Sequence, residues 1–344
     1  MVTYWFLYII PAISAIQAGK QKSKSILSWV ILAFIFILII GLRHEVGGDW
    51  FNYLGHFEMY LDVPLSIAFE QGDPGYVFLN WSMGKIGLDH YAVNFICAII
   101  FVSGLFAFAR HLPYPWLGIA VAVPYLVVVV AMGYTRQGVA LGFLFWGLTQ
   151  LEQKRFKSFI FSILLAALFH KTAIIMVGLA LFTQGKGKLL RLLATLAIGY
   201  GLWSSFLAED QANLWHNYVE AAMHSEGARI RAFMNLVPGL LLLFFWKKWK
   251  NTYPNPKFWL WMAVGSIVVF PLVDFASTAV DRMALYMTPL QVAVFARLPE
   301  LVYSGNSKTV IIGVLFGYAL TLFVWLNFAT HAPYWLPYQN WLFS

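Results

Sequence analysis

The amino-acid sequence predicts an all-α protein that crosses a membrane many times. Of its 344 residues, 60% are hydrophobic and 11% are charged, whereas soluble domains carry about 25% charged residues. These apolar runs are too long and too uniform for the alternating strands of a membrane barrel, so helices must satisfy the backbone in lipid. The long apolar runs are 26–42, 92–109, 117–132, 139–150, 258–273 and 310–328.

The net charge and the cysteine content of the chain argue against a nucleic-acid partner and against a disulfide. The net charge of +8 is explained by basic loops on the cytoplasmic side, so no nucleic-acid partner is expected. Cys97 is the single cysteine, which excludes an intramolecular disulfide. The N-terminus has no basic stretch and no small-residue cleavage site of a signal peptide. We therefore expect one integral membrane domain over residues 1–344 and no soluble domain.

Basic loops orient the first five apolar segments, because short cytoplasmic loops are rich in Lys and Arg. The basic loop 20–24 follows the first segment, which places this loop inside and the N-terminus outside. The second segment exits, and residues 43–91 form the first external loop. The third segment returns to Arg110, the fourth exits near Tyr134, and the fifth returns to the basic loop 154–157.

The apolar stretch 158–184 is interrupted by His170 and Lys171, and it can be interpreted in two ways. A single helix of about 40 Å would place this pair near mid-bilayer and would export the basic loop 186–191 and every later basic loop. Two short arms of about 18 Å each, meeting at His170 and Lys171, bring that loop back inside. The second interpretation obeys the positive-inside rule and is the one predicted.

The remaining apolar segments follow the same alternation. The eighth segment exits, and residues 207–232 form the second external loop. The ninth returns to the basic loop 247–257, the tenth exits near Asp274, and the eleventh returns through Arg297. The last segment leaves an aromatic, Pro-rich tail outside. The prediction is about twelve transmembrane segments, with both termini extracytoplasmic.

This topology leaves a set of cations on the outer face, where the positive-inside rule does not expect them. A membrane protein that gathers cations there is expected to hold an anion, although anchoring to lipid headgroups is the alternative for each one. His170 and most of the carboxylates fall on the same side. The external cations are Arg43, Lys85, Arg136, Lys171, Arg229, Arg231 and Arg282.

Other polar residues accompany these cations in short clusters. An ionisable pair at membrane depth, such as His170 with Lys171, is a functional hypothesis by default. Asp49 follows two glycines, and we expect it to cap the helix that comes next. Tyr286 lies one helical turn beyond Arg282. The supporting candidates are Glu45, Tyr53, Asp73, Tyr76, Gln137, Asp281 and Tyr286.

Five of these segments resemble, in order, the EpsG/Wzy-type family of bacterial polysaccharide polymerases. Together they extend across most of the chain, and all of them fall outside in the topology derived from charge. The region around Arg229 and Arg231 resembles the family less clearly. The matching segments are GLRHEVGGDWFNY (41–53), DPGYVFLNW (73–81), TRQGVALGF (135–143), FHKTAII (169–175) and DRMALYMTPLQ (281–291).

The resemblance implies a GT-C-like fold and an enzyme of O-antigen, capsule or exopolysaccharide assembly in the bacterial cytoplasmic (inner) membrane. Such enzymes move a glycan from undecaprenyl pyrophosphate to the non-reducing-end sugar of another lipid-linked repeat unit, at the outer (periplasmic) face. A flippase and a chain-length regulator are implied partners, beside membrane lipid. The activated donor needs no nucleotide, cofactor or metal.

The residues fit this chemistry. Arg43, Arg136, Lys171 and Arg282, with Arg229 or Arg231 in addition, are candidates to bind and stabilise the departing pyrophosphate. His170 is the first candidate for general base, because its pKa lies nearest the working pH. Asp49 is the second candidate. Asp49, Glu45 or Asp281 could instead orient an arginine, and Arg282 is counted with the catalytic residues.

Three other functions stay open. An O-antigen ligase shares the donor, but ligases usually carry a large external loop late in the chain, and here the largest comes first. A transporter or flippase for lipid-linked sugar predicts inverted repeats and charges open to both sides, and the sequence has no clear repeat. An acyltransferase would need an acyl-donor path. Metal-ligand spacings, Walker A loops, GxSxG and dinucleotide fingerprints are absent.

Overall fold

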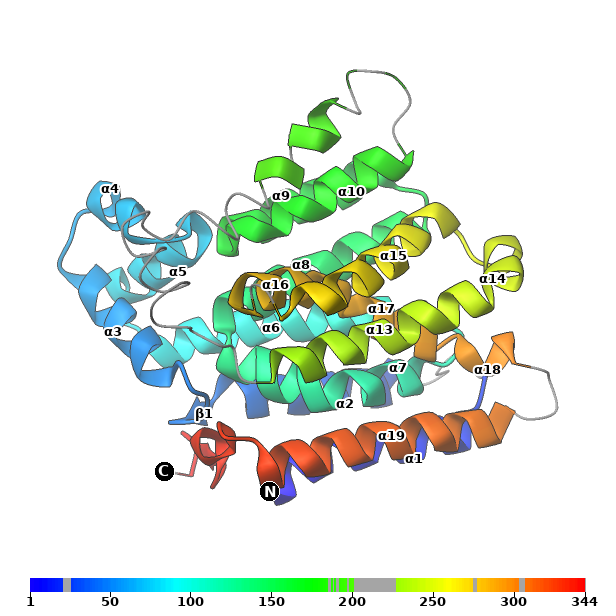
Figure 1. The fold of residues 1–344 in the computed structure, drawn as a ribbon. Helices are drawn as coiled ribbons and strands as arrows, with labels where there is room; N and C mark the ends of the chain where they lie inside the picture. Colours follow the sequence, from blue (N-terminus) through cyan, green and yellow to red (C-terminus); the bar gives the residue numbers. More distant parts are fainter. Residues whose placement is uncertain are drawn as a thin grey trace.

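The computed structural model of this protein is built almost entirely from helices (Figure 1). It describes residues 1–20, 26–184, 187, 189, 192–196, 198–200, 227–274, 277–302 and 307–343. The predicted all-α class is confirmed for these residues, since their strands are limited to the short pair β1 (Arg43–His44) and β2 (Gln339–Asn340). Most of the predicted second external loop, 207–226, lies outside the described residues.

The first half of the chain forms a series of apolar helices, with a group of shorter helices between α2 and α6. These elements are α1 (Val2–Ala18), α2 (Ile26–Gly41), α3 (Trp50–Leu61), α4 (Leu65–Ala68), the 3₁₀ helix η1 (Phe69–Gln71), α5 (Pro74–Lys85), α6 (His90–Arg110), α7 (Pro115–Ala122), the π-helix η2 (Val123–Ala131), α8 (Thr135–Glu152), α9 (Phe156–Phe169), η3 (Lys171–Ile174) and α10 (Ile175–Gln184).

The second half continues the helical bundle and ends in a short tail. Its elements are α13 (Ala228–Phe244), α14 (Trp246–Thr252), α15 (Pro256–Leu272), α16 (Ser277–Ala284), η5 (Leu285–Met287), α17 (Pro289–Phe295), α18 (Leu298–Leu301), α19 (Ser307–Phe328) and η6 (Ala332–Trp335). Proline opens α5, α7, α15 and α17, a position where its missing N–H costs nothing.

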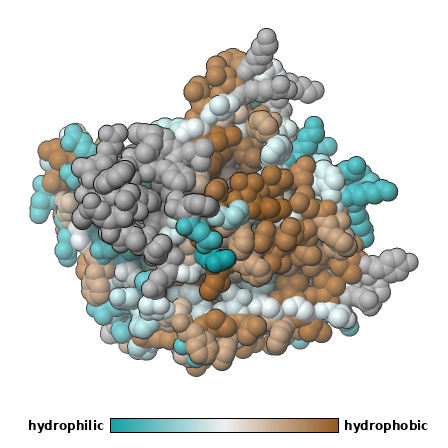
Figure 2. Space-filling view, in the orientation of Figure 1, coloured by the Kyte–Doolittle hydropathy of each residue, from teal (hydrophilic) through white to brown (hydrophobic). Residues whose placement is uncertain are grey.

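Two of the described helices, α6 and α19, are long and apolar enough to cross a membrane. The pair α13 and α14, bent by 81°, makes a third if it is counted as one span. Shorter apolar helices of 10–17 residues include α1, α2, α9 and α15. Figure 2 shows a broad apolar face over α13 and α15, with hydrophilic residues toward its ends. The exposed side chains of these two helices include Ile230, Phe233, Trp261 and Val268.

One end of the bundle gathers loops that carry the predicted cytoplasmic charges. Lys20, after α1, lies 3.1 Å from the Glu300 carboxylate of α18. Arg297, after α17, donates from Nη2 to the Glu152 carboxylate at the end of α8, over 2.8 Å. Asn255, before α15, donates to the Leu151 carbonyl. These loops, far apart in the sequence, therefore share one end of the molecule.

The opposite end carries β1, α3 to α5, and both chain termini (Figure 1). Contacts between distant segments join it together. Arg43 Nη2 donates to Thr135 Oγ1 over 2.9 Å, Arg136 Nη1 donates to Asp73 Oδ2 over 3.1 Å, and the Tyr286 hydroxyl lies 3.0 Å from His170 Nδ1. Every one of these residues falls in a segment that the charge pattern places outside.

The chain reverses between α9 and α10. Near the start of α9, Phe159 packs on Phe258 at the beginning of α15, with ring centroids 5.9 Å apart. Ile175, at the start of α10, packs with the hydrophobic cluster at the far end of α15. Seven residues later, Phe182 meets Trp261, with centroids 5.2 Å apart. Since α15 is one continuous helix, α9 and α10 run in opposite directions along it.

The C-terminal tail folds back onto the end that carries β1. Strand β2 pairs antiparallel with β1, and the buried Trp335 donates from Nε1 to the Val128 carbonyl of the π-helix over 2.7 Å. A β-carbon at Gly133 would lie 2.6 Å from the Trp335 ring, so the close approach needs glycine there. Tyr4 of α1 donates to the Trp335 carbonyl. The tail thereby ties the first helix to the π-helix that precedes Arg136.

Candidate functional site

A cavity of about 780 Å³ opens at the end of the bundle that carries β1. It lies between the short helices α3 to α5 and the helices α8, α9 and α16. Cations and carboxylates from five sequence segments face into it. Its lining is Asp49, Tyr53, Glu70, Gln71, Gly72, Asp73, Pro74, Tyr125, Tyr134, Arg136, Gln137, Ala167, His170, Lys171, Thr172, Tyr200, Asp281, Arg282 and Leu285.

Arg136 and Asp73 link the start of α5 to the start of α8. Arg136 is the second residue of α8, and Asp73 directly precedes Pro74 at the start of α5. Their side chains pair over 3.1 Å, with Arg136 37% exposed and Asp73 10% exposed. Burial raises the pKa of Asp73, while the Arg136 charge and the Lys171 backbone N–H oppose that rise. Arg136 also lines the cavity, where its guanidinium is the type of group that binds an anion.

His170 lies in the turn between α9 and η3, with both ring nitrogens in contact with polar groups. Nε2 lies 3.3 Å from the Gln137 amide nitrogen, whereas Nδ1 lies 2.6 Å from Thr172 Oγ1 and 3.0 Å from the Tyr286 hydroxyl. If the Gln137 amide donates to Nε2, the ring proton is on Nδ1, where a hydroxyl oxygen accepts it. That tautomer directs the Nε2 lone pair toward the Gln137 side of the cavity.

Nearby cations favour the neutral imidazole. Burial lowers the pKa of His170 to about 3, and Arg136, Arg282 and Lys171 act in the same direction. The pKa therefore lies farther from the working pH than the sequence-based choice of this base assumed. A neutral ring is the form that can accept a proton, and in this tautomer the Nε2 lone pair is held by the Gln137 amide. The arrangement therefore fits a general base better than a cationic anchor.

Asp281 and Arg282 bring α16 to the same cavity. Asp281 accepts two hydrogen bonds from the Arg231 guanidinium, over 2.7 and 2.8 Å. This two-bond geometry fixes both side chains. Arg231 therefore acts on the cavity through Asp281, whereas Arg282 lines it directly.

The structure brings together most of the residues that the sequence singles out, but not all of them. The predicted residues that line the cavity are Asp49, Tyr53, Asp73, Arg136, Gln137, His170, Lys171, Asp281 and Arg282. Tyr286 and Arg231 do not line the cavity, but Tyr286 contacts His170 and Arg231 contacts Asp281, which do. Arg229, Glu45 and Tyr76 are elsewhere: Arg229 is exposed and 3.9 Å from Asp274, Glu45 lies 3.9 Å from His44, and Tyr76 is buried against Tyr53.

Arg43 is placed away from the cavity as well. Its side chain is buried, and it donates from Nη1 to the Ile40 carbonyl over 2.7 Å and from Nε to the Val46 carbonyl over 3.2 Å. A third hydrogen bond reaches Thr135, and Trp50 lies against the guanidinium, 5.6 Å away. These contacts hold the end of α2 to the start of α8, which is a structural role.

Asp49 differs locally from its expected role. It precedes α3 at the N-cap position, but its side chain makes no capping hydrogen bond. The carboxylate instead accepts from the Asn52 side chain over 3.4 Å and faces the cavity. Burial raises the pKa of Asp49, with the Asn52 hydrogen bond and the Arg136 charge opposing the rise.

Sequence reasoning missed several lining residues. Thr172 lies inside a quoted motif, two residues from His170, and Tyr134 directly precedes another, two residues from Arg136, but a hydroxyl side chain there carries no distinctive signal. Tyr125 lies in an apolar run and reaches the cavity from the π-helix. Among the residues that the structure describes, no group of three His, Cys, Asp or Glu side chains could hold a metal ion.

Comparison with known proteins agrees with the segments that carry the resemblance. Residues 26–340 match the model of the EpsG family. The search of curated proteins and the search of solved structures each find no match. The matched range contains all the cavity residues, from Asp49 to Leu285. Because it spans well over half of the sequence, this chain belongs to the EpsG family.

Proposed function

We propose that this membrane protein is a polysaccharide polymerase of a defined type. It moves a glycan from undecaprenyl pyrophosphate to the non-reducing-end sugar of a second lipid-linked repeat unit, at the outer face of the bacterial cytoplasmic membrane. Membership in the EpsG family supports a polysaccharide polymerase in the general sense. The observation that supports the finer assignment is a cavity where Arg136, Lys171 and Arg282 surround a neutral His170.

The proposed reaction is a displacement at the anomeric carbon of the donor. The acceptor hydroxyl oxygen forms a bond to that carbon, and the bond from the carbon to the pyrophosphate oxygen breaks. The electron pair leaves with undecaprenyl pyrophosphate. The acceptor hydroxyl displaces the Gln137 amide from His170 Nε2, which accepts the hydroxyl proton. Arg136, Lys171 and Arg282 stabilise the charge that grows on the leaving group, where preorganised cations are most effective.

The carboxylates have supporting roles in this proposal. Asp73 orients Arg136 through their ion pair, and Asp281 fixes α16 through Arg231. Asp49 remains the second candidate for the base, since it faces the cavity and burial raises its pKa toward the working range. A chain-length regulator and a flippase are the partners that this reaction implies.

The proposal includes a GT-C-like bundle of about twelve spans with both termini outside. It is supported by the grouping of predicted cytoplasmic loops at one end and of the cavity at the other. Lys188 lies outside the described residues, but the two interpretations of 158–184 place it on opposite sides of the membrane. Its side therefore tests whether the chain turns back at His170. A cysteine at Lys188 should resist a membrane-impermeant thiol reagent in intact cells and react after permeabilisation, because the loop is inside. Labelling in intact cells would contradict the topology.

Product analysis with the purified protein tests the reaction itself. Supplied only with a lipid-linked repeat unit, the protein should give a ladder of longer lipid-linked glycans and free undecaprenyl pyrophosphate. A ligase would need a lipid A core acceptor before any glycan was transferred. A flippase would leave the repeat unit intact and only change its membrane leaflet. Either of those two results would overturn the proposed function.

A further inference from the structure

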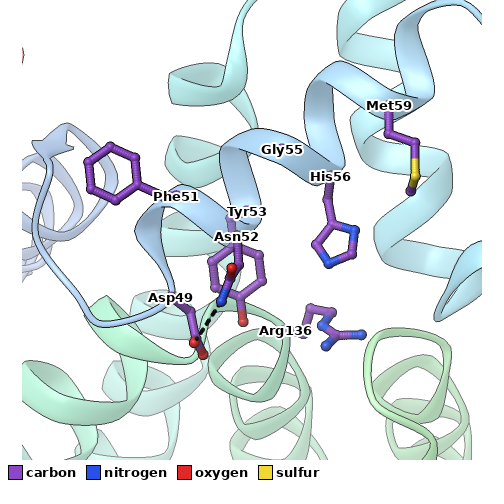
Figure 3. A pocket seen from close by; sticks show the side chains of 8 residues that line it. All are labelled: Asp49, Phe51, Asn52, Tyr53, Gly55, His56, Met59 and Arg136. Atoms are coloured by element: carbon purple, nitrogen blue, oxygen red, sulfur yellow. Dashed lines mark hydrogen bonds between the residues drawn. The ribbon is translucent and has the colours of Figure 1, made fainter.

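A second cavity, of about 460 Å³, lies beside the first and is built mainly by α3. Asn52, His56 and Met59 recur every three or four residues, which puts them on one face of this helix, and Asp49 directly precedes it. Figure 3 shows Asn52, His56 and Met59 projecting from α3 on the side where Arg136 lies. The lining is Asp49, Phe51, Asn52, Tyr53, Gly55, His56, Met59 and Arg136.

The two cavities meet at shared residues. Asp49, Tyr53 and Arg136 line both of them. The Arg136 guanidinium is therefore at the boundary, with Asp73 on one side and the α3 face on the other. A molecule in the second cavity would be next to an anion held in the first.

The chemistry of the two cavities differs. Among the described residues that line the second cavity, Arg136 is the only Lys or Arg, whereas the first also has Lys171 and Arg282. The second offers an amide from Asn52 and the imidazole of His56, and its lining also includes the exposed apolar side chains of Phe51 and Met59. Burial, with Arg136 nearby, lowers the pKa of His56, which favours its neutral form.

Neutral hydrogen-bonding groups beside apolar and aromatic side chains fit an uncharged sugar. Hydroxyl groups pair with planar amide, imidazole and carboxylate groups, and the C–H face of the ring packs on apolar surface. A pyrophosphate, in contrast, carries several negative charges and is bound best by several Arg or Lys side chains. The second cavity therefore suits the part of the substrate that carries no charge.

We propose that the second cavity is the acceptor subsite, which binds the non-reducing-end sugar of the incoming repeat unit, and that Asn52 and His56 select it. This inference rests on the proposed function. The donor reacts at the carbon next to its pyrophosphate, so it needs the cation-lined cavity. The acceptor reacts at the sugar farthest from its lipid, so it needs a neutral site that touches that cavity. Asp49, at the boundary, is placed to orient the attacking hydroxyl.

The test separates acceptor binding from donor binding. The donor is the purified lipid-linked repeat unit, and the acceptor is the same oligosaccharide as an octyl glycoside, which has no pyrophosphate and cannot act as donor. Asn52→Ala and His56→Ala should each raise the KM for the octyl glycoside about tenfold, since each removes one or two hydrogen bonds. The donor KM should change less. The measurement is the initial rate of extended glycoside formation at varied acceptor concentration.

Glu58→Ala is the matched control, because Glu58 is exposed on the same helix and does not line either cavity. It should leave both KM values unchanged. If an alanine variant fails to fold, as judged by its melting temperature, Asn52→Asp and His56→Gln replace it and should alter the preference among acceptor sugars.

Two failures can be told apart. A wild-type protein that joins no lipid-linked units would overturn the proposed function, and the acceptor subsite with it. If the wild-type protein extends the octyl glycoside, and the Asn52 and His56 variants have the wild-type KM for it, the acceptor subsite alone would be overturned. A rise in the donor KM without a rise in the acceptor KM would assign the second cavity to the donor instead.

Discussion

Arg136→Ala should lower the rate of polymer formation by about 10²–10³-fold, the usual loss when one donor to a developing anion is removed. Arg136 is the cation that lines both cavities, and its loss also leaves the Asp73 carboxylate without its partner at 3.1 Å. Arg136→Lys should retain part of the rate, because lysine keeps the charge but lacks the planar two-donor geometry. The measurement is the rate of undecaprenyl pyrophosphate release by purified protein.

Two other cations that the charge pattern predicts to be external provide the contrast. Lys85 donates to the Leu61 carbonyl and lies outside both cavities, so Lys85→Ala should have wild-type rates. Arg43→Ala should instead lower the melting temperature and the amount of protein, because it leaves buried carbonyls without donors. A wild-type rate for Arg136→Ala, or an equal loss for Lys85→Ala, would remove Arg136 from the anion site.

His170→Ala should lower the rate by about 10²–10⁴-fold, the range typical of a positioned general base. His170→Gln should be equally slow, because glutamine keeps hydrogen bonds but cannot take up a proton near neutral pH. Both variants should be present at wild-type levels. Near wild-type activity in His170→Gln would show that the ring only holds Thr172 and Tyr286 in place.

The pH profile adds a second readout for the same residue. A base works only when unprotonated, so activity falls as the pH drops through its pKa. Burial and the neighbouring cations lower the pKa of His170, so the acid limb of kcat/KM should lie below about 6.5, the ordinary histidine value. That limb should be missing in His170→Gln. If Asp49→Asn removes the limb instead, Asp49 is the base.

The helical class and the set of polar segments could be predicted because both are local properties. A long apolar run without charges permits only a helix in lipid, and polar residues at its ends are visible one segment at a time. The positions of Arg136, His170, Lys171 and Arg282 followed from that pattern, and the structure places all four on one cavity.

The individual roles of the arginines could not be predicted in this way. Arg43 and Arg136 both begin or follow an apolar run, yet Arg43 turns inward to the Ile40 and Val46 carbonyls while Arg136 faces Asp73. The orientation of each arginine depends on the acceptors within reach. Thr135, which also accepts from Arg43, is far from Arg43 in the sequence, and Asp73 is far from Arg136. Charge and topology treat the two residues alike.

The sequence by itself determined the helical membrane class, the family and the polar segments that carry the cations, because apolar runs and short motifs are each read locally. Only the tertiary structure decided which cations share a cavity, how Gln137, Thr172 and Tyr286 surround the His170 ring, and how Trp335 reaches the π-helix. Those contacts join residues far apart in the chain. Their geometry depends on how the helices pack, which no single segment specifies.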